Sequence, residues 1–145
     1  MVTLNKFYLP IALLLALGLG WTLGCQSAGK NISKDQAWDI VKKDILKEQP
    51  GNRVVYLNNT LLNAGQERKS WGDVHKVPAN FRQAWLFFVD DQPDANWGHH
   101  CRYVFVDTET GKYHVINSLN PPDSLEGMSQ IYPPTGAEKQ NVFKQ

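Results

Sequence analysis

The residues best suited to chemistry stand together in one stretch, Trp97–Cys101, which reads WGHHC. Imidazole and thiolate groups are common zinc ligands, and a neighbouring His and Cys can also act as base and nucleophile. We predict a strand over His100–Asp107, where His99 and Cys101 would share one face because side chains alternate along a strand. Two ligands do not complete a structural zinc site, which needs four. The spacing therefore favours a buried Cys101 with the histidines at the strand entrance over a metal or catalytic site.

The two remaining histidines do not readily complete a site. A turn at Thr108–Gly111 would pair His114 with Phe105 on the neighbouring strand. That position is six residues from His99, or about 20 Å along the strand, so the two imidazoles cannot share a metal. His75 lies in a segment of ambiguous structure and is free to approach. A small-ligand or metal-binding site built on the WGHHC stretch therefore stays open as an alternative.

Carboxylates offer a second candidate for chemistry. Asp90, Asp91 and Asp94 cluster at a strand end and in the loop that follows, and carboxylate oxygens are the ligands that calcium prefers. No glycine-punctuated loop of the EF-hand kind accompanies them, so a solvated, turn-forming cluster is favoured. The chain also carries no nucleophile elbow, phosphate loop or HExxH motif. We expect no catalytic residues, no cofactor and no resident metal.

The charge balance excludes one class of partner. The chain has 145 residues, with 15 Lys and Arg against 14 Asp and Glu and a formal net charge of +1. Proteins that bind nucleic acid present strongly basic surfaces, so we expect no nucleic-acid partner. The length predicts a single domain.

Residues 1–24 are a different kind of sequence from the rest. Lys6 is their only charge, and the apolar run dominated by Ile11–Leu19 has the length of a signal-peptide core. At its end, Leu23-Gly24-Cys25 resembles the lipobox of bacterial lipoproteins. The resemblance implies a signal peptide over residues 1–24, cleavage before Cys25, and lipid on the Cys25 thiol that anchors the protein to a membrane.

Two other fates of this segment remain open. Phe7–Gly24 spans 18 residues, near the minimum for an uncleaved membrane anchor, and ordinary secretion is the third option. All three place residues 26–145 outside the cytoplasm. Gln26 stands where an Asp would resemble the signal for retention in the inner membrane. We therefore expect a lipid-anchored location in the cell envelope, at the outer membrane if the envelope is Gram-negative.

Local patterns predict one helix followed by strands. After a tether over residues 25–32, Ser33–Gln36 reads as a capping box, and Pro50-Gly51 cannot extend the helix, which should stop by Gln49. The period then changes to two, and four β-rich runs follow: Arg53–Leu57, Gln83–Asp90, His100–Asp107 and Lys112–Asn117. We predict an α+β domain over residues 33–132, with the helix on an antiparallel meander of about four strands, and a mobile tail over residues 133–145.

Two short stretches resemble a PepSY-type domain. Ile32–Ala37 (ISKDQA) followed by Val41 is similar to the opening of that domain, and Val104–Asp107 with Thr110-Gly111-Lys112 is similar to its closing hairpin. The resemblance spans residues 32–117, most of the exported chain. It implies a PepSY- or cystatin-like two-layer fold and a protein-binding or inhibitory role, with a peptidase as one candidate partner.

Both faces of the predicted sheet are apolar. In Gln83–Asp90, for example, large apolar side chains occupy both alternating sets of positions. One helix covers a single face, and an antiparallel sheet with a wet face would instead alternate polar residues outward. The second face is therefore covered either by the chain itself, through residues 58–79 or 125–132, or by a protein or peptide partner, because large exposed apolar patches mark interaction sites.

These observations lead to a ranked set of functions. The leading hypothesis is an extracytoplasmic, lipid-anchored, non-enzymatic module that binds a protein or peptide. Trp71 and Trp97, both in expected loops, are its candidate contact residues, with His99 and Cys101 as further binding candidates. The alternatives are a small-ligand or metal-binding lipoprotein using His99 and Cys101, and a purely structural lipoprotein of the envelope.

Overall fold

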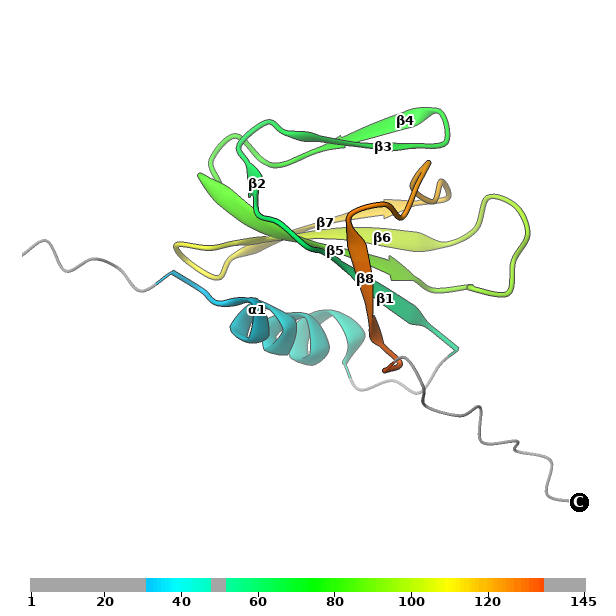
Figure 1. Ribbon diagram of the computed structural model, residues 1–145, viewed down its shortest axis with the longest axis horizontal. Helices are drawn as coiled ribbons and strands as arrows, with labels where there is room; N and C mark the ends of the chain where they lie inside the picture. Colours follow the sequence, from blue (N-terminus) through cyan, green and yellow to red (C-terminus); the bar gives the residue numbers. More distant parts are fainter. Residues whose placement is uncertain (1–30, 48–51, 135–145) are drawn as a thin grey trace, which may run out of the picture.

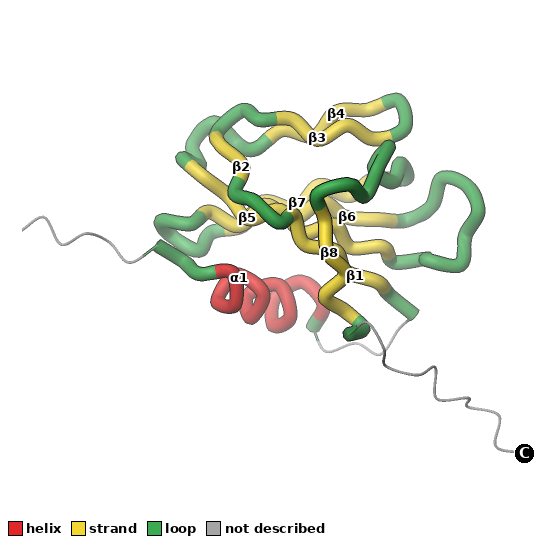
Figure 2. The backbone as a smooth tube through the Cα atoms, viewed as in Figure 1, coloured by secondary structure: helices red, strands yellow, loops and turns green. Residues whose placement is uncertain are grey.

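The computed structural model describes residues 31–47 and 52–134, which form three layers (Figure 1). A helix lies below an antiparallel sheet, and a small hairpin lies above it; Figure 2 shows the same arrangement by type of element. The α+β class and the helix-then-sheet order predicted from the sequence are confirmed. The expected signal peptide, Cys25, nearly all of the tether, and residues 135–145 lie outside the described residues.

The helix begins at the predicted capping box. The Gln36 N–H donates to Ser33 Oγ at 3.2 Å, and the Ser33 N–H donates to Gln36 Oε1 at 2.9 Å, so two backbone donors at the helix start are satisfied. The α-helical part, α1 (Lys34–Ile40), continues directly into a π-helical part, η1 (Val41–Leu46). The helix ends at Lys47, which has a left-handed backbone with φ of 50°.

In the described residues eight strands follow the helix, more than the four expected. They are β1 (Val54–Asn58), β2 (Leu62–Asn63), β3 (Glu67–Ser70), β4 (Asp73–Lys76), β5 (Gln83–Asp90), β6 (Cys101–Asp107), β7 (Tyr113–Ser118) and β8 (Met128–Tyr132). The main sheet has the order β7-β6-β5-β1-β8, with β2 also paired to β5, and β3 and β4 form a separate hairpin. The four long strands of the expected meander are β1, β5, β6 and β7.

The β6–β7 turn sets the register that the sequence predicted. Val106 pairs with Tyr113 and Phe105 pairs with His114. At Gly111 the φ angle is 71°, and a Cβ built there would lie 3.3 Å from Ile40 Cδ1. Glycine is therefore favoured twice over, by a backbone conformation that other residues rarely adopt and by the close approach of the helix.

The first apolar layer lies between the helix and the sheet. Its fully buried residues come from α1, η1 and one set of alternating positions on the strands: Ala37, Val41, Leu46, Val55, Leu57, Phe87, Val89, Val104 and Val106. Trp38 stacks on Phe87 with ring centroids 6.1 Å apart. The Ile32 N–H donates to the carbonyl of Thr108 at 2.6 Å, so the chain enters the domain beside the β6–β7 turn.

The second face of the sheet is covered by the chain itself. Leu62, Val77 and Phe81, from the segment between β1 and β5, pack against Leu86 and Phe105 in a second buried cluster. Of the two alternatives left open, self-coverage is the one observed among the described residues. Residues 125–132 contribute less, because β8 pairs with β1 at the edge of the sheet and only its Met128 packs against this cluster. A bare second face is therefore not available as a docking surface.

Candidate functional site

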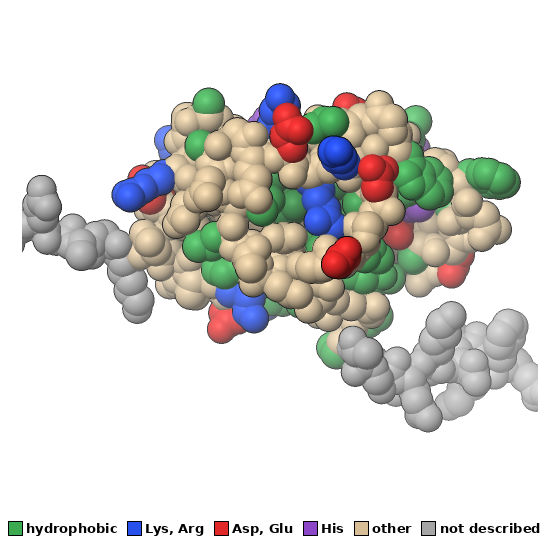
Figure 3. All heavy atoms as spheres, turned by 45° about the horizontal axis from the view of Figure 1, so that its top comes forward, with side chains coloured by type: hydrophobic (Ala, Val, Ile, Leu, Met, Phe, Trp, Pro, Cys, Tyr) green, Lys and Arg blue, Asp and Glu red, His purple; other side chains and the backbone are tan. Residues whose placement is uncertain are grey.

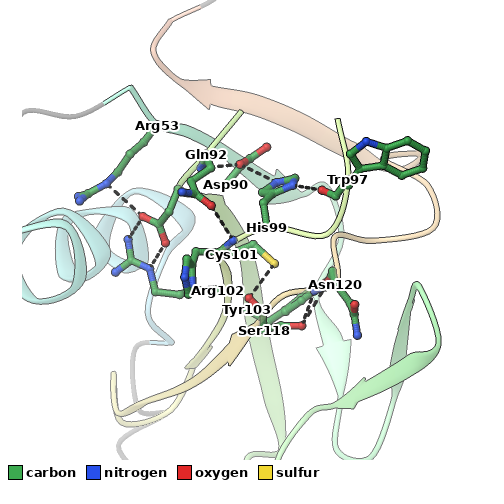
Figure 4. A network of polar contacts seen from close by, with 12 residues as sticks. Arg53, Asp90, Gln92, Trp97, His99, Cys101, Arg102, Tyr103, Ser118 and Asn120 are labelled. Carbon is green, nitrogen blue, oxygen red and sulfur yellow. Dashed lines mark hydrogen bonds and ion pairs between the residues drawn. The ribbon is translucent and has the colours of Figure 1, made fainter. Parts of the chain in front are cut away.

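The WGHHC stretch is a loop that is held by hydrogen bonds and leads into β6 (Figure 4). β6 begins at Cys101, one residue later than predicted, so His99 and His100 lie in the preceding loop and the strand alternation expected for His99 does not hold. His99 and Cys101 are buried, whereas Trp97 is 80% exposed. The predicted arrangement of a buried thiol with histidines at the strand entrance is confirmed, with His99 buried and His100 exposed.

His99 holds the loop to the end of β5. Its Nδ1 donates to the carbonyl of Trp97 at 2.6 Å, and its Nε2 lies 3.0 Å from Asp90 Oδ1 without forming a hydrogen bond. In the other direction, the His99 N–H donates to the carbonyl of Leu119 at 2.9 Å. Both ring nitrogens therefore face oxygen atoms of this chain, an arrangement that suits anchoring of the loop.

Cys101 is a buried and unreactive thiol. Its side chain is 2% exposed, and the Sγ–H donates to the carbonyl of Ser118 at 3.5 Å. Burial, which disfavours the charged thiolate, raises the pKa of the Cys101 thiol to about 11. The group is therefore a neutral thiol near pH 7, and a neutral thiol is neither a nucleophile nor a metal ligand.

His75 packs on Tyr103 and joins no metal-binding group in the described residues. It lies in β4 with its Nε2 3.2 Å from Ser70 Oγ, and its ring packs against Tyr103 with centroids 3.9 Å apart. Within the described residues no three His, Cys, Asp or Glu side chains are grouped to hold a metal ion. Burial disfavours the charged imidazolium and lowers the pKa of His75.

The acidic cluster is divided among separate partners. Arg102 donates to Asp91 from Nε at 2.7 Å and from a terminal nitrogen at 2.6 Å, and Arg53 Nε lies 3.1 Å from Asp91 Oδ1. Asp94 instead bonds Asn52 beside a shallow, open hollow. The same arginines also donate to the last helix carbonyls, Arg102 to Ile45 at 3.1 Å. Asp91 thus neutralises two arginines that cap the helix.

Exposed apolar side chains gather where β6 begins and the β3–β4 hairpin turns. Trp97 is 80% exposed, Leu119 55% and Trp71 50%. Backbone bonds join their segments: His99 donates to the Leu119 carbonyl, and Trp71 donates to the carbonyl of Pro121 at 3.2 Å. We call Trp71, Trp97 and Leu119 the aromatic end. In Figure 3 hydrophobic side chains project from the right-hand end of the molecule, beside a histidine.

The sequence identified two of these three residues. The sequence predicts Trp71 and Trp97 in loops, and they lie in the β3–β4 turn and in the β5–β6 loop. Leu119 was missed, because a single apolar residue between Ser118 and Pro121 belongs to no periodic pattern. Gly98 is the one local signal: a Cβ there would lie 2.9 Å from the Leu119 carbonyl oxygen, so a glycine lets the two segments touch.

The fold and its exposed end define a small α+β domain with an aromatic surface. No family model matches the chain, and comparisons with curated proteins and with solved structures find no match. The lipobox and PepSY resemblances therefore stay predictions. No helix within residues 31–47 or 52–134 is long and apolar enough to cross a membrane.

Proposed function

We propose that this protein is an exported, lipid-anchored, non-enzymatic module that binds a protein or peptide through its aromatic end. The observation that carries the proposal is Trp97, a large apolar side chain that is 80% exposed at the end of a loop. Tryptophan is enriched among the residues that dominate binding energy at protein interfaces. Trp71 and Leu119 supply further exposed apolar area on segments that backbone hydrogen bonds link to this loop.

The loop that presents Trp97 is fixed although the side chain is exposed. The His99 ring donates to the Trp97 carbonyl, the His100 backbone N–H donates to Gln92 Oε1 at 3.1 Å, and the Asp91 N–H donates to the His100 carbonyl at 3.2 Å. A surface that is already ordered loses less conformational entropy when a partner binds. The fixed backbone of this loop therefore favours a role in binding.

The point at which the chain enters the domain also suits binding of a partner. The chain enters at Ile32, beside Thr108, while Trp97 lies just before the opposite end of β6. β6 runs from Cys101 to Asp107, which separates the two ends by about 20 Å. A lipid on Cys25 would therefore hold the β6–β7 turn near the membrane and leave the aromatic end directed away from it.

The PepSY resemblance supports the same class of function and suggests a peptidase as the partner. The raised pKa and the burial of the Cys101 thiol argue against its use as a nucleophile. A hydrolytic activity of the purified protein that is lost in Cys101→Ala would overturn the non-enzymatic part of the proposal.

Site-specific photo-crosslinking in the intact envelope tests the binding surface. A photoreactive amino acid is placed at position 97, and the matched control carries it at Lys34, an exposed residue at the start of the helix and away from β7. We expect a defined polypeptide adduct from position 97 alone. Equal adducts from both positions, or none from either, would contradict the proposal.

The anchor is tested separately. Cys25→Ser should lose radiolabelled fatty acid and leave the membrane fraction, whereas Cys101→Ser should keep both. If Cys25→Ser stays in the membrane and remains unprocessed, the segment over residues 1–24 is an uncleaved anchor instead of a lipoprotein signal.

A further inference from the structure

β7 forms one edge of the main sheet and presents unpaired backbone groups. Within the described residues it pairs only with β6. The Asp107 N–H donates to the Lys112 carbonyl at 2.8 Å, so Asp107 and Lys112 are a hydrogen-bonded pair of the β6–β7 ladder. Because hydrogen-bonded and non-hydrogen-bonded pairs alternate in an antiparallel ladder, the backbones of Tyr113, Val115 and Asn117 face away from β6. Nothing else in the described chain bonds to these outward groups.

This edge has none of the usual protection against pairing. Natural edge strands are blunted by charged side chains, proline, bulges or short length. β7 reads YHVINS over six residues, with no Lys, Arg, Asp, Glu or Pro. The β3–β4 hairpin differs, because most of its strand residues are charged. The other edge of the main sheet, β8, has five residues, carries a register shift against β1 and is followed by Pro133-Pro134.

Both apolar layers extend as far as β7. Val115 packs on the cluster between the helix and the sheet, and Ile116 packs on the cluster on the opposite face. Both side chains are only partly buried, and Tyr113 is exposed. A strand added beside β7 would therefore gain backbone hydrogen bonds and also continue two hydrophobic layers.

We propose that β7 pairs with β7 of a second copy of this chain, antiparallel, about a two-fold axis at Val115. In this register Val115 faces its own equivalent, Tyr113 faces Asn117 of the other copy, and His114 faces Ile116. All three outward-facing residues then fall in hydrogen-bonded pairs, because each has both backbone groups directed outward. Lys112 would face Ser118, so no like charges oppose one another. Two copies of β7 match in length and in hydrogen-bonding pattern, and no like charges oppose one another between them. This match favours a second copy over an unrelated peptide.

The symmetry suits a membrane-bound dimer. A two-fold axis between antiparallel strands of one continuous sheet is perpendicular to that sheet, so both helices lie on the same side. Ile32 packs in the helix-side layer, and both chains therefore enter the domain on that side. This point rests on the proposed lipid anchor, whereas the β7 pairing does not.

Disulfide trapping in the envelope tests the register. The double variant Tyr113→Cys/Asn117→Cys should form a covalent dimer under mild oxidation, because paired Cα atoms lie about 5.5 Å apart. The single variants Tyr113→Cys and Asn117→Cys are matched controls and should not link, since each new thiol would face a residue without one. Ser129→Cys, exposed on β8, is the control for the other edge. The parent chain reports any background from Cys25.

A second variant measures the association itself. Asn117→Pro removes only an outward-facing N–H from an exposed position, so it should keep the thermal unfolding transition and abolish the dimer on sedimentation of the full chain in detergent. The pairing is overturned if the parent chain sediments as a monomer, if Asn117→Pro dimerises like the parent, or if the double variant links only to a different protein. Photo-adducts from position 97 would be unaffected, so this proposal can fail independently of the proposed function.

Discussion

The imidazole of His75 lies against the phenol ring of Tyr103 with centroids 3.9 Å apart, under the β3–β4 hairpin. His75 is 3% exposed, and the buried Tyr103 hydroxyl donates to the Asn120 carbonyl at 2.9 Å. This pair joins the hairpin to β6, so the charge state of one side chain bears on how firmly the hairpin covers the second sheet face.

We expect acid to destabilise the domain through His75. Burial lowers its pKa below the ordinary value of 6.5, so the unfolded chain takes up a proton at a pH where the folded chain does not. Stability is therefore full above the unfolded value and falls as pH decreases from 6.5 toward the native pKa, by at most about 1.4 kcal/mol per pH unit. Urea unfolding between pH 7.5 and 5 measures this loss.

His75→Phe is the matched variant, because it keeps an aromatic ring on Tyr103 and removes the titrating group. Its stability should depend less on pH across the same window. An identical pH profile in the parent and the variant would assign the effect to other groups.

Cys101 should resist thiol reagents in the folded protein. With the thiol pKa raised to about 11, the thiolate fraction at pH 8 is about 100-fold below that of an ordinary cysteine, and burial slows access further. A Cys25→Ser chain isolates this thiol for labelling with a chromogenic disulfide. Labelling should be fast in urea and at least about 100-fold slower in buffer. Rapid labelling in buffer would contradict the claim that the Cys101 thiol is buried and un-ionised in the folded protein.

Removal of the Asp91 charge should weaken the junction between the helix and the sheet. Asp91→Asn leaves Arg53 and Arg102 facing each other without a carboxylate, and breaking such a partly buried network should cost about 2 kcal/mol. Asp39→Asn removes an exposed carboxylate that pairs with Lys42 on the helix, and should cost less than about 0.5 kcal/mol. Chemical unfolding compares the two variants, and equal losses would argue against a special role of Asp91.

The two tryptophans Trp97 and Trp38 should respond differently to truncation. Trp97→Ala should change the free energy of unfolding by less than about 0.5 kcal/mol, because the side chain is 80% exposed. Trp38 stacks on Phe87 in the helix-side layer, so Trp38→Ala should cost about 3 kcal/mol. A large loss in Trp97→Ala would show that Trp97 covers the core and would remove the main support for the binding surface.

Local patterns predicted the parts of the fold that depend on neighbours in sequence. The capping box at Ser33 located the helix start, since both of its hydrogen bonds join residues three positions apart. The period of two in β5 and β6 predicted which side chains share a face, and the Thr108–Gly111 turn predicted the pairing of Phe105 with His114.

The extra strands could not be predicted in the same way. β3 and β4 show no apolar alternation, because the two residues buried on their inner face, Ser70 and His75, are themselves polar. β8 has apolar residues at irregular positions, and its pairing with β1 joins segments about 70 residues apart. Such pairing depends on what the rest of the sheet leaves unpaired, which no local window contains.

By itself the sequence determined the class of the fold, the two apolar faces of the sheet, and the candidates Trp71, Trp97, His99 and Cys101. Only the tertiary structure decided what each candidate does. The WGHHC stretch looks like a metal or nucleophile motif in one dimension, but the folded chain directs the His99 ring at Trp97 and Asp90 and buries the Cys101 thiol against Ser118. Chemistry depends on which atoms remain accessible after packing, and packing joins residues that the sequence keeps far apart.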